Sequence, residues 1–306
     1  MIVYKELSSL TSDLGFSAKA LYSVSNHIGR HYRAVSVPKG NGESRRLHVP
    51  DALLKAIQRR INDRLLSLEA VSAYATAYRA GGSTKRNAAP HVGKPVLLKM
   101  DIRHFYDSLI YPLVKEKAFP KERYSEQNRV LLSLLCIYND TLPQGAPSSP
   151  TISNIIMRDF DERVGQWCAQ QDITYTRYCD DMTFSGDFDP HPVIRFVRKE
   201  LQSLGLFLNN RKTVVARTGQ KQAVTGIVVN ETTHIPSGYK AALRQELYYC
   251  RKFGIASHLL HCGIDESPER YAQKLLGRVS YVLSVEPQNR QMQDYRAFLQ
   301  SCLQSR

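Results

Sequence analysis

Two carboxylates stand side by side at Asp180 and Asp181, in the stretch ITYTRYCDDMTFSG. The residues on either side, ITYTRY and MTFSG, are typical of two short β-strands, which places the aspartates at the tip of a hairpin. Adjacent side chains on a strand point to opposite faces, but a tight turn breaks this alternation and lets both carboxylates approach one point. Their repulsion is costly unless a cation lies between them, so the pair indicates a metal site. The alternative is a solvated turn that happens to carry two aspartates.

A third carboxylate, Asp101, ends the compact apolar run PVLLKMD, which predicts a buried strand. With it, the expected ligand set consists of carboxylate oxygens alone, without a His or Cys. Such ligands favour Mg²⁺ over zinc, and Mg²⁺ takes one or two carboxylates together with substrate phosphates. We therefore expect a site for two Mg²⁺ ions built on Asp101, Asp180 and Asp181. Asp107 lies close to Asp101 in sequence, but we interpret it as a surface or capping charge.

The charge of the chain favours a polyanionic partner. Its 306 residues include 42 Lys and Arg against 28 Asp and Glu, a formal net charge of +14, and the pI is near 9.5. Such a surplus points to nucleic acid, although a merely solvated basic surface would give the same count. The hydrophobic fraction of 42% is typical of a globular chain, in one large domain or two to three modest ones.

The six cysteines are scattered and form no CxxC pair, which is typical of a reduced intracellular protein without a disulfide framework or zinc site. The N-terminal stretch MIVYKELSSLTSDLG carries early charges and no long apolar run, so no signal peptide is predicted. No apolar stretch approaches the ~18 residues of a membrane helix. We therefore expect a cytoplasmic protein with no membrane partner.

The elements that must position the carboxylates follow a mixed order of the α/β (α+β) class. Residues 17–29 predict a short helix, and HYRAVSVPKGNGESRRLHVP predicts a hairpin around the turn-rich PKGNGES. Asp51 is the expected N-cap of the next helix. The apolar stripe of that helix is predicted to be Leu53, Ile57, Ile61 and Leu65.

Downstream of the third carboxylate, helices and strands are expected to alternate. The patterns predict helices over SEQNRVLLSLLCIYND, after Pro150 and over residues 190–204. They predict further strands at KTVVAR and AVTGIVVN, and after Pro236 a chain that is helical to its end.

Within the C-terminal helical part, GYKAALRQELYYCRKFG presents two different faces. The face expected to pack on the protein carries Leu243, Leu247, Cys250 and Gly254. The second face lies roughly a quarter-turn away and carries Lys240, Arg244, Tyr248 and Arg251. Cations for phosphate and a ring for stacking make it a predicted RNA-binding face, and an ordinary solvated face is the alternative.

Four stretches together resemble the motifs of a reverse transcriptase: MDIRHFYDSL, LPQGAPSSPTISNIIM, YCDD and GLFLNNRKT. They follow in the order and at the spacings of that family, over roughly residues 30 to 230. The resemblance implies a right-hand polymerase with fingers, a palm of antiparallel sheet plus helices, and a short helical thumb. The expected division is N-terminal helices and fingers over 1–95, palm over 96–235 with a fingers insertion at about 111–142, and an RNA-binding thumb over 236–306.

Two further stretches resemble the signatures of bacterial retron reverse transcriptases. NAAPH runs from Asn87 to His91, and VTG comprises Val224, Thr225 and Gly226. The resemblance implies that these stretches bind RNA, and we interpret His91 as a structural or RNA-contacting residue rather than a catalytic base. The alternatives are a group II intron-like or diversity-generating reverse transcriptase, or a non-catalytic RNA-binding scaffold on the polymerase fold.

The resemblance also implies the roles of the catalytic residues. Asp101 and Asp180 would bridge the two Mg²⁺ ions, with Asp181 as the third carboxylate and the Ile102 carbonyl as a further ligand. At Cys179 many members carry alanine, and packing is the expected role of the small thiol.

Other matched residues would contact the incoming dNTP. Tyr106 matches the sugar gate that excludes a 2′-hydroxyl, whereas Phe105 suits core packing. The remaining expected nucleotide contacts are Gln144 and Gly145, which match the motif that lines the incoming nucleotide, Lys39 and Arg45 on the triphosphate, and Lys212 near the leaving pyrophosphate.

The retron resemblance finally implies a biological role. Retron enzymes copy part of their own noncoding RNA, starting from a 2′-hydroxyl of a guanosine, into branched multicopy single-stranded DNA (msDNA). They act in anti-phage defence, usually with a separate effector protein. These partners are expectations from resemblance alone.

Overall fold

The computed structural model describes residues 3–38 and 44–304 and divides into two compact units. Unit 1 comprises Met1–Gly82 and Leu98–Val215, and unit 2 comprises Ser83–Leu97 and Ala216–Arg306. Each unit has its own hydrophobic core. None of the helices in the described ranges combines the length and apolar character needed to cross a membrane.

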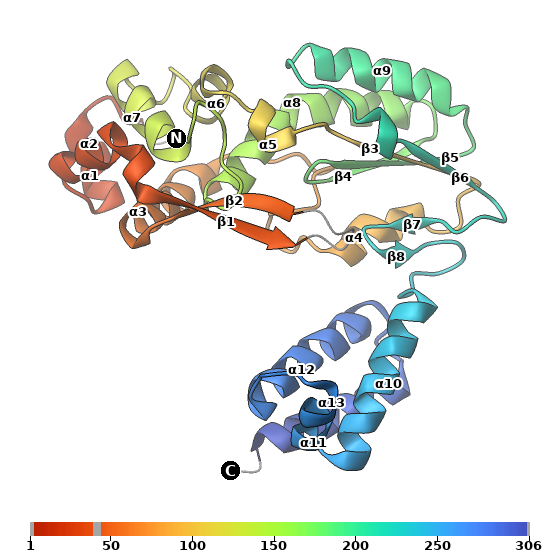
Figure 1. Ribbon diagram of the computed structural model, residues 1–306. Coiled ribbons are helices and arrows are strands. Elements are labelled where there is room, and N and C mark those ends of the chain that lie inside the picture. The colour runs from red at the N-terminus through yellow and green to blue at the C-terminus, as the bar shows by residue number, and fades with distance from the viewer. Residues whose placement is uncertain (1–2, 39–43, 305–306) are drawn as a thin grey trace. The chain divides into compact units, whose positions relative to one another are not determined.

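Unit 1 holds most of the helices and the strands around the predicted carboxylates (Figure 1). Its α-helices are α1 (Leu7–Leu14), α2 (Ala18–Asn26), α3 (Ala52–Arg64), α5 (Phe105–Ser108), α6 (Tyr111–Ala118), α7 (Glu126–Cys136), α8 (Ser149–Ala169) and α9 (Pro190–Gln202). Its 3₁₀ helices are η1 (Ile28–His31), η2 (Leu66–Leu68) and η4 (Asn210–Lys212). Its strands are β1 (Tyr32–Pro38), β2 (Ser44–Pro50), β4 (Thr174–Tyr178) and β5 (Asp181–Gly186), joined by most of β3 (Val96–Asp101) and part of β6 (Val214–Arg217).

A four-stranded sheet with the order β4-β5-β3-β6 forms the base of the predicted site. β4 and β5 are an antiparallel hairpin, and β3 lies next to β5 although about eighty residues separate the two strands along the chain. Helices α8 and α9 cover one face of this sheet (Figure 1), and Trp167 of α8 stacks on Phe196 of α9 with ring centroids 4.5 Å apart. The sheet thus brings the end of β3 beside the β4–β5 turn.

The N-terminal elements of unit 1 largely follow the predicted pattern. β1 and β2 pair as the expected antiparallel hairpin, and the Asp51 carboxylate caps α3 by accepting from the Leu54 amide at 2.9 Å. The predicted apolar stripe of α3 is wrong by one position at its start, because Leu53 is exposed and Leu54 is buried. On a helix of 3.6 residues per turn, a strict four-residue spacing drifts by about 40° per step, so Leu53 falls off the stripe and Leu54 faces the core with Ile57 and Ile61.

Unit 2 combines a small hairpin with a helical bundle. The elements are α4 (Thr84–Ala88), η3 (Ala89–His91), β7 (Ala223–Val224), β8 (Ile227–Val228), α10 (Ser237–Phe253), α11 (Ile255–Cys262), α12 (Pro268–Val285) and α13 (Arg290–Gln304). The long helices α12 and α13 pack closely on each other, and α10 packs on α11 and α12. This bundle bears out the helical C-terminal part that the sequence predicts.

The two compact units differ from the three-part division expected from sequence. The predicted fingers and palm fall mostly together in unit 1, within one core. Residues 83–97 and 216–235, expected in the fingers and palm, instead belong to unit 2 with the predicted thumb helices. The names fingers, palm and thumb therefore remain sequence-based predictions.

Candidate active site

The turn between β4 and β5 carries the paired aspartates. In the hairpin register Tyr178 pairs with Asp181, so Cys179 and Asp180 form a two-residue loop. Asp181 is the first residue of β5 and its side chain is exposed, whereas Asp180 is half-buried. The two-residue loop breaks the alternation of the strands, as the sequence predicts for a turn with adjacent carboxylates.

Asp101 at the end of β3 lies next to this turn. The Ile102 amide donates to the Asp180 carbonyl at 3.1 Å, which ties the two segments together through their backbones. The buried Asp101 carboxylate accepts from Asn209 Nδ2 at 3.0 Å and from Lys212 Nζ at 2.7 Å. Lys212, the predicted pyrophosphate-side lysine, thus reaches the acidic residues while its side chain keeps most of its solvent contact.

The electrostatics at the turn show that the three carboxylates influence one another. Asp181 retains solvent contact, yet burial by nearby protein atoms, followed by repulsion from Asp180 and Asp101, raises the pKa of Asp181 to about 6. The hydrogen bond to Asp101 raises the pKa of Lys212 in turn. Mutual repulsion of this kind is relieved by a cation, which is the condition for a metal site of carboxylate oxygens.

The donor set fits a hard divalent cation. All three side chains offer carboxylate oxygens, and the set includes no thiol or imidazole. A ligand set of oxygens alone favours Mg²⁺ over zinc. Within residues 3–38 and 44–304, however, no three His, Cys, Asp or Glu side chains lie close enough to hold a metal ion as they stand. The Lys212 ammonium lies against Asp101, so cation binding at Asp101 requires that this ion pair open.

Tyr106 lies beside the turn rather than in the core. Its ring is half-buried and its hydroxyl is 3.6 Å from the Cys179 sulfur, while the neighbouring Phe105 is buried and in the core. Burial, reinforced by Asp180, raises the pKa of the Cys179 thiol to about 11, so the thiol is protonated at neutral pH and packs as a small side chain. The structure thus places Tyr106 beside Cys179 of the turn, and its sugar-gate role remains a prediction.

The second predicted nucleotide-contacting stretch lies against strand β2. The His48 amide donates to the Gln144 carbonyl at 2.8 Å, and Gly145 has a φ of +115°. A Cβ on Gly145 would lie 2.8 Å from the His48 carbonyl oxygen, so the close approach of β2 requires glycine here, whatever the ligand requires. Arg45 is exposed on β2, and Lys39 lies outside the described residues.

Comparison with known proteins identifies the family. Residues 37–234 match the reverse transcriptase (RNA-dependent DNA polymerase) family. The chain belongs to the reverse transcriptase family. It is 34% identical over 285 residues to the retron Mx65 reverse transcriptase of Myxococcus xanthus, covering 85% of this chain and 66% of that relative, slightly under two thirds. It is 32% identical over 222 residues to the retron Ec83 reverse transcriptase of Escherichia coli, covering 68% of this chain and 71% of that relative.

Among solved structures, the telomerase of Candida albicans, determined in complex with a fragment of telomeric RNA, aligns with a TM-score of 0.47 at 14% identity, covering 90% of this chain and 58% of that one. The family match and these retron relatives place the chain among the retron reverse transcriptases.

In this reverse transcriptase the two retron signatures meet inside unit 2. Asn87 Nδ2 lies 3.5 Å from the Thr225 hydroxyl, which also donates to the Thr84 carbonyl at 3.2 Å. The hairpin that carries Val224, Thr225 and Gly226 is thereby held on α4. Thr225 and Gly226 both adopt positive φ, at 46° and 81°. We call Asn87, His91, Val224, Thr225 and Gly226 the signature cluster.

The burial of this cluster corrects part of the predicted RNA contacts. Asn87, His91 and Val224 have no exposed surface, so their side chains cannot touch RNA in this fold. Burial, followed by repulsion from Lys94, lowers the pKa of His91 to about 4, so its ring is neutral at pH 7. Gly226 is exposed and Thr225 is half-buried, which leaves the turn of the hairpin as the accessible part of the cluster.

The two predicted faces of α10 are present. Leu243, Leu247 and Cys250 are fully buried, as expected for the packing face, but Gly254 ends the helix as its C-cap. The residues Arg244, Tyr248 and Arg251 of the other face are exposed. Lys240 differs, because its ammonium is bound to Glu286 at 2.8 and 3.1 Å, so it is committed to an ion pair within unit 2.

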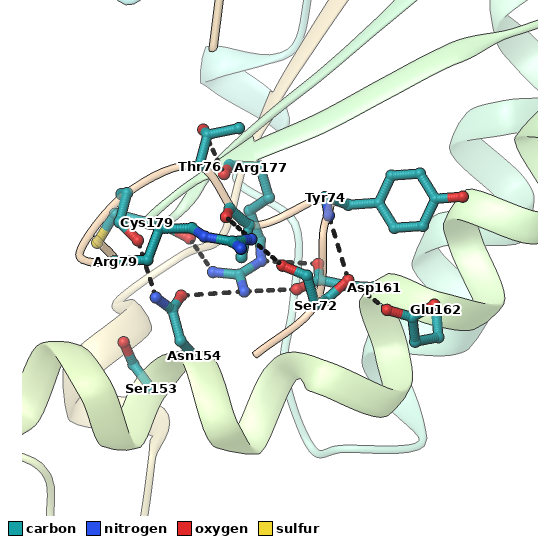
Figure 2. A network of polar contacts seen from close by, with 12 residues as sticks. Ser72, Tyr74, Thr76, Arg79, Ser153, Asn154, Asp161, Glu162, Arg177 and Cys179 are labelled. Carbon is teal, nitrogen blue, oxygen red and sulfur yellow. Dashed lines mark hydrogen bonds and ion pairs between the residues drawn. The ribbon is translucent and has the colours of Figure 1, made fainter. Parts of the chain in front are cut away.

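One group beneath the turn was not predicted. Arg177, two residues before Cys179, is completely buried and forms a two-pronged ion pair with Asp161 of α8 (Figure 2). The available signal was a cation near the end of a predicted strand, since an arginine that a strand directs into the protein requires a partner. The sequence did not reveal which carboxylate that partner would be.

Proposed function

We propose that the chain is a retron reverse transcriptase that copies part of its own noncoding RNA into branched msDNA, using a magnesium-dependent site at Asp101, Asp180 and Asp181. The observation that carries the proposal is the convergence of the β3 end and the β4–β5 turn, where the Ile102 amide donates to the Asp180 carbonyl at 3.1 Å. At this point burial, followed by repulsion from Asp180 and Asp101, raises the pKa of Asp181 to about 6. The membership of the retron group supports the choice of template.

The residues at this site can divide the work of nucleotidyl transfer. Asp101, Asp180 and Asp181, with the Ile102 carbonyl as a further oxygen, would hold two Mg²⁺ ions, which lower the pKa of the priming hydroxyl and neutralise charge on the triphosphate. Asn209 orients the Asp101 carboxylate through its hydrogen bond at 3.0 Å. Lys212, released from Asp101, can then turn its ammonium to the leaving pyrophosphate.

Tyr106, Gln144 and Gly145 would shape the site for a deoxynucleotide. The Tyr106 ring stands beside the turn, where its bulk would oppose a 2′-hydroxyl on the incoming sugar. Arg45 is exposed on β2, where its planar fork suits triphosphate oxygens. Lys39 is proposed for the same role from its place in the sequence.

In this account the cognate RNA provides both the template and the primer. Synthesis would start from a 2′-hydroxyl of a guanosine in that RNA, so the product is RNA and DNA joined at a branch. The exposed face of α10, with Arg244, Tyr248 and Arg251, is proposed to contact the RNA. If the chain is a retron reverse transcriptase, a role in defence with a separate effector protein follows.

The nucleic acid that co-purifies with the protein tests this proposal. The protein is isolated from cells that carry its native locus, and the bound nucleic acid is run on a denaturing gel after RNase, DNase or debranching treatment. A species shortened by RNase and by DNase separately, and separated into two strands by a debranching enzyme, is expected. An unbranched product made by an active polymerase would point to the group II intron-like or diversity-generating alternatives, and bound RNA without any divalent-dependent synthesis would point to a scaffold.

A further inference from the structure

The catalytic turn has an unfavourable backbone conformation. Cys179 has a φ of +60°, in the left-handed region, and it is the first residue of the two-residue loop. A two-residue hairpin loop with positive φ at this position normally carries glycine, because a Cβ makes the conformation costly. The loop therefore needs contacts from its surroundings to keep the geometry that presents Asp180 and Asp181.

The buried Arg177 guanidinium supplies such a contact. Its Nη1 donates to the Cys179 carbonyl at 2.8 Å, and this carbonyl belongs to the peptide between Cys179 and Asp180. The hairpin turn types differ in the direction of this central peptide, so a donor fixed to the carbonyl selects one of them. With the Ile102 amide on the Asp180 carbonyl at 3.1 Å, both loop carbonyls are held.

The other side of the guanidinium is anchored on α8. Arg177 Nε and Nη2 donate to the two Asp161 oxygens at 2.8 and 2.6 Å, and Nη2 also reaches Asn154 Oδ1 at 3.2 Å (Figure 2). The Tyr175 hydroxyl donates to Asp161 at 2.9 Å. Arg177 and Asp161 have no exposed side-chain surface, so the anchor is rigid and excludes water.

The segment from Tyr74 to Ala77 also holds Arg177 in place. The backbone of Arg177 is bound on both sides, since its amide donates to the Tyr74 carbonyl and its carbonyl accepts from the Thr76 amide, each at 2.8 Å. Asn154 Nδ2 donates to the Ala77 carbonyl at 2.9 Å, so α8 also holds the same segment. The guanidinium thus projects from a fixed strand and cannot follow the turn if the peptide rotates.

Stability alone does not account for this arrangement. Buried ion pairs are often no more stabilising than apolar residues of similar volume, because desolvation of the charges offsets their attraction. An apolar pair at Arg177 and Asp161 would fill the same space but leave the Cys179 carbonyl without its donor. The feature that only the guanidinium supplies is the fork that joins α8 to the catalytic turn.

We propose that Arg177 is a positioning residue, which fixes the Cys179–Asp180 peptide from the buried Asp161 anchor and so sets the Asp180 and Asp181 carboxylates for divalent cation binding. This inference rests on the proposed metal role of these two aspartates. It assigns no contact between Arg177 and substrate. It explains how a non-glycine residue is kept at the strained position of the turn.

The test compares two variants: Arg177→Lys, and Asp161→Asn at the ion-pair partner of Arg177. Lysine keeps the charge opposite Asp161 but lacks the fork, so the bond to the Cys179 carbonyl is lost. Asp161→Asn removes the opposing charge but keeps the donor on the turn. Arg129→Lys is the matched control, because Arg129 is also buried, binds Glu116 and Glu126, and donates to the Phe119 carbonyl at 2.8 Å without touching the turn.

Three quantities are measured for each variant: the midpoint of thermal unfolding, the affinity for Mn²⁺ by electron paramagnetic resonance, and the single-turnover rate of nucleotide addition. The Mn²⁺ titration uses the protein with a template, a dideoxy-terminated primer and the next dNTP. Arg177→Lys should lose roughly ten- to hundredfold in both Mn²⁺ affinity and rate. Arg129→Lys should lower the midpoint of thermal unfolding but leave the Mn²⁺ affinity and the rate within about twofold of wild type. Asp161→Asn should lower the unfolding midpoint strongly and the Mn²⁺ affinity less, because the donor on the turn remains.

Wild-type Mn²⁺ affinity and rate in Arg177→Lys would overturn the inference, as would equal losses in Arg129→Lys at a matched unfolding midpoint. If Arg177→Lys does not fold, the double variant Arg177→Gln/Asp161→Asn replaces it, since it removes both buried charges and its shorter amide cannot reach the Cys179 carbonyl. Asp180→Asn is assayed in parallel. Normal Mn²⁺ binding and synthesis in that variant would reject the proposed site itself, whereas losses there without losses in the Arg177 variants would reject only the positioning role.

Discussion

The catalytic turn of unit 1 and the signature cluster of unit 2 both hold polar side chains in tight, partly strained loops. At the turn, the supporting Arg177 and Asp161 are buried, while Asp181 and Lys212 keep contact with solvent. In the signature cluster, the polar residue Asn87 and the titratable His91 are themselves fully buried. The first arrangement presents charge to a ligand, and the second joins two parts of the chain.

This difference shows that the residues of a sequence motif can have a structural role without contacting a ligand. The aspartates are short, charged and placed where strands end, so they act directly in the proposed chemistry. Asn87 and Thr225 instead connect α4 to the β7–β8 hairpin, which leaves the exposed hairpin turn to meet any ligand. Variants at the two regions should therefore fail in different ways, in synthesis at the turn and in stability at the cluster.

The largest effect is expected at the turn. Asp180→Asn should reduce DNA synthesis on the order of a thousandfold or more, because it removes a charge from a proposed bridging ligand. Single-nucleotide primer extension measures the rate, and thermal unfolding checks that the variant folds. Asp107→Asn is the matched control, since Asp107 is exposed outside the site and its variant should extend primers normally. Near-normal extension by Asp180→Asn would remove this aspartate from the site.

The signature cluster should instead show a dependence of stability on pH. His91 has a folded-state pKa of about 4, below its unfolded value of about 6.5, so the unfolded chain binds more protons between these pH values. The contribution of His91 to the free energy of unfolding is therefore complete above pH 6.5. It falls as the pH drops toward 4, by up to about 3 kcal/mol.

Chemical denaturation of wild type and His91→Gln over this pH range measures the effect. The variant should have the shallower dependence, because its buried side chain does not titrate. Parallel curves for the two proteins would show that His91 does not contribute to the pH dependence, and the buried position would then need another explanation.

A sharper view of the turn comes from Tyr106. Tyr106→Val should raise incorporation of rNTP relative to dNTP by roughly ten- to hundredfold, because a smaller side chain leaves room for the 2′-hydroxyl. Tyr106→Phe keeps the ring and should keep the wild-type ratio, although it loses the hydroxyl near the Cys179 sulfur. Competition between the two nucleotides on an RNA template measures the ratio, and an unchanged value for Tyr106→Val would exclude the sugar-gate role.

The smallest effect per residue is expected on α10 of unit 2. Charge reversal of Arg244 and Arg251 should weaken binding of the cognate RNA and lower its salt dependence by about one unit of slope per lost phosphate contact. Arg296→Glu, at an exposed position on α13, serves as the matched charge control. Filter binding at several salt concentrations gives the slope. If the double variant and the control lose affinity equally, the effect is one of net charge and not of this face.

The sequence predicted those features that depend on neighbours along the chain. The β4–β5 hairpin with its turn at the aspartates, the Asp51 cap and the burial of Leu243 and Leu247 all follow from local pattern. The apolar stripe of α3 was wrong by one residue at Leu53, because a strict four-residue spacing drifts by about 40° per step around a helix of 3.6 residues per turn.

Features that depend on distant partners were beyond local pattern. Arg177 pairs with Asp161 on a different element, and Asn87 meets Thr225, which lies 138 residues further along the chain. Gly145 was expected to admit a ligand, but its glycine is required already by the His48 carbonyl of β2. In each case tertiary packing decides the contact.

Asp101, Asp180 and Asp181 are proposed to bind together the divalent cations of nucleotide addition. Anomalous diffraction from a crystal grown with template, dideoxy-terminated primer, dNTP and Mn²⁺ tests this proposal most directly. The account predicts two Mn²⁺ peaks between the end of β3 and the β4–β5 turn, with oxygen ligands from the three aspartates and with Lys212 moved off Asp101. Peaks elsewhere, or an intact Lys212–Asp101 ion pair with no Mn²⁺ at the turn, would contradict it.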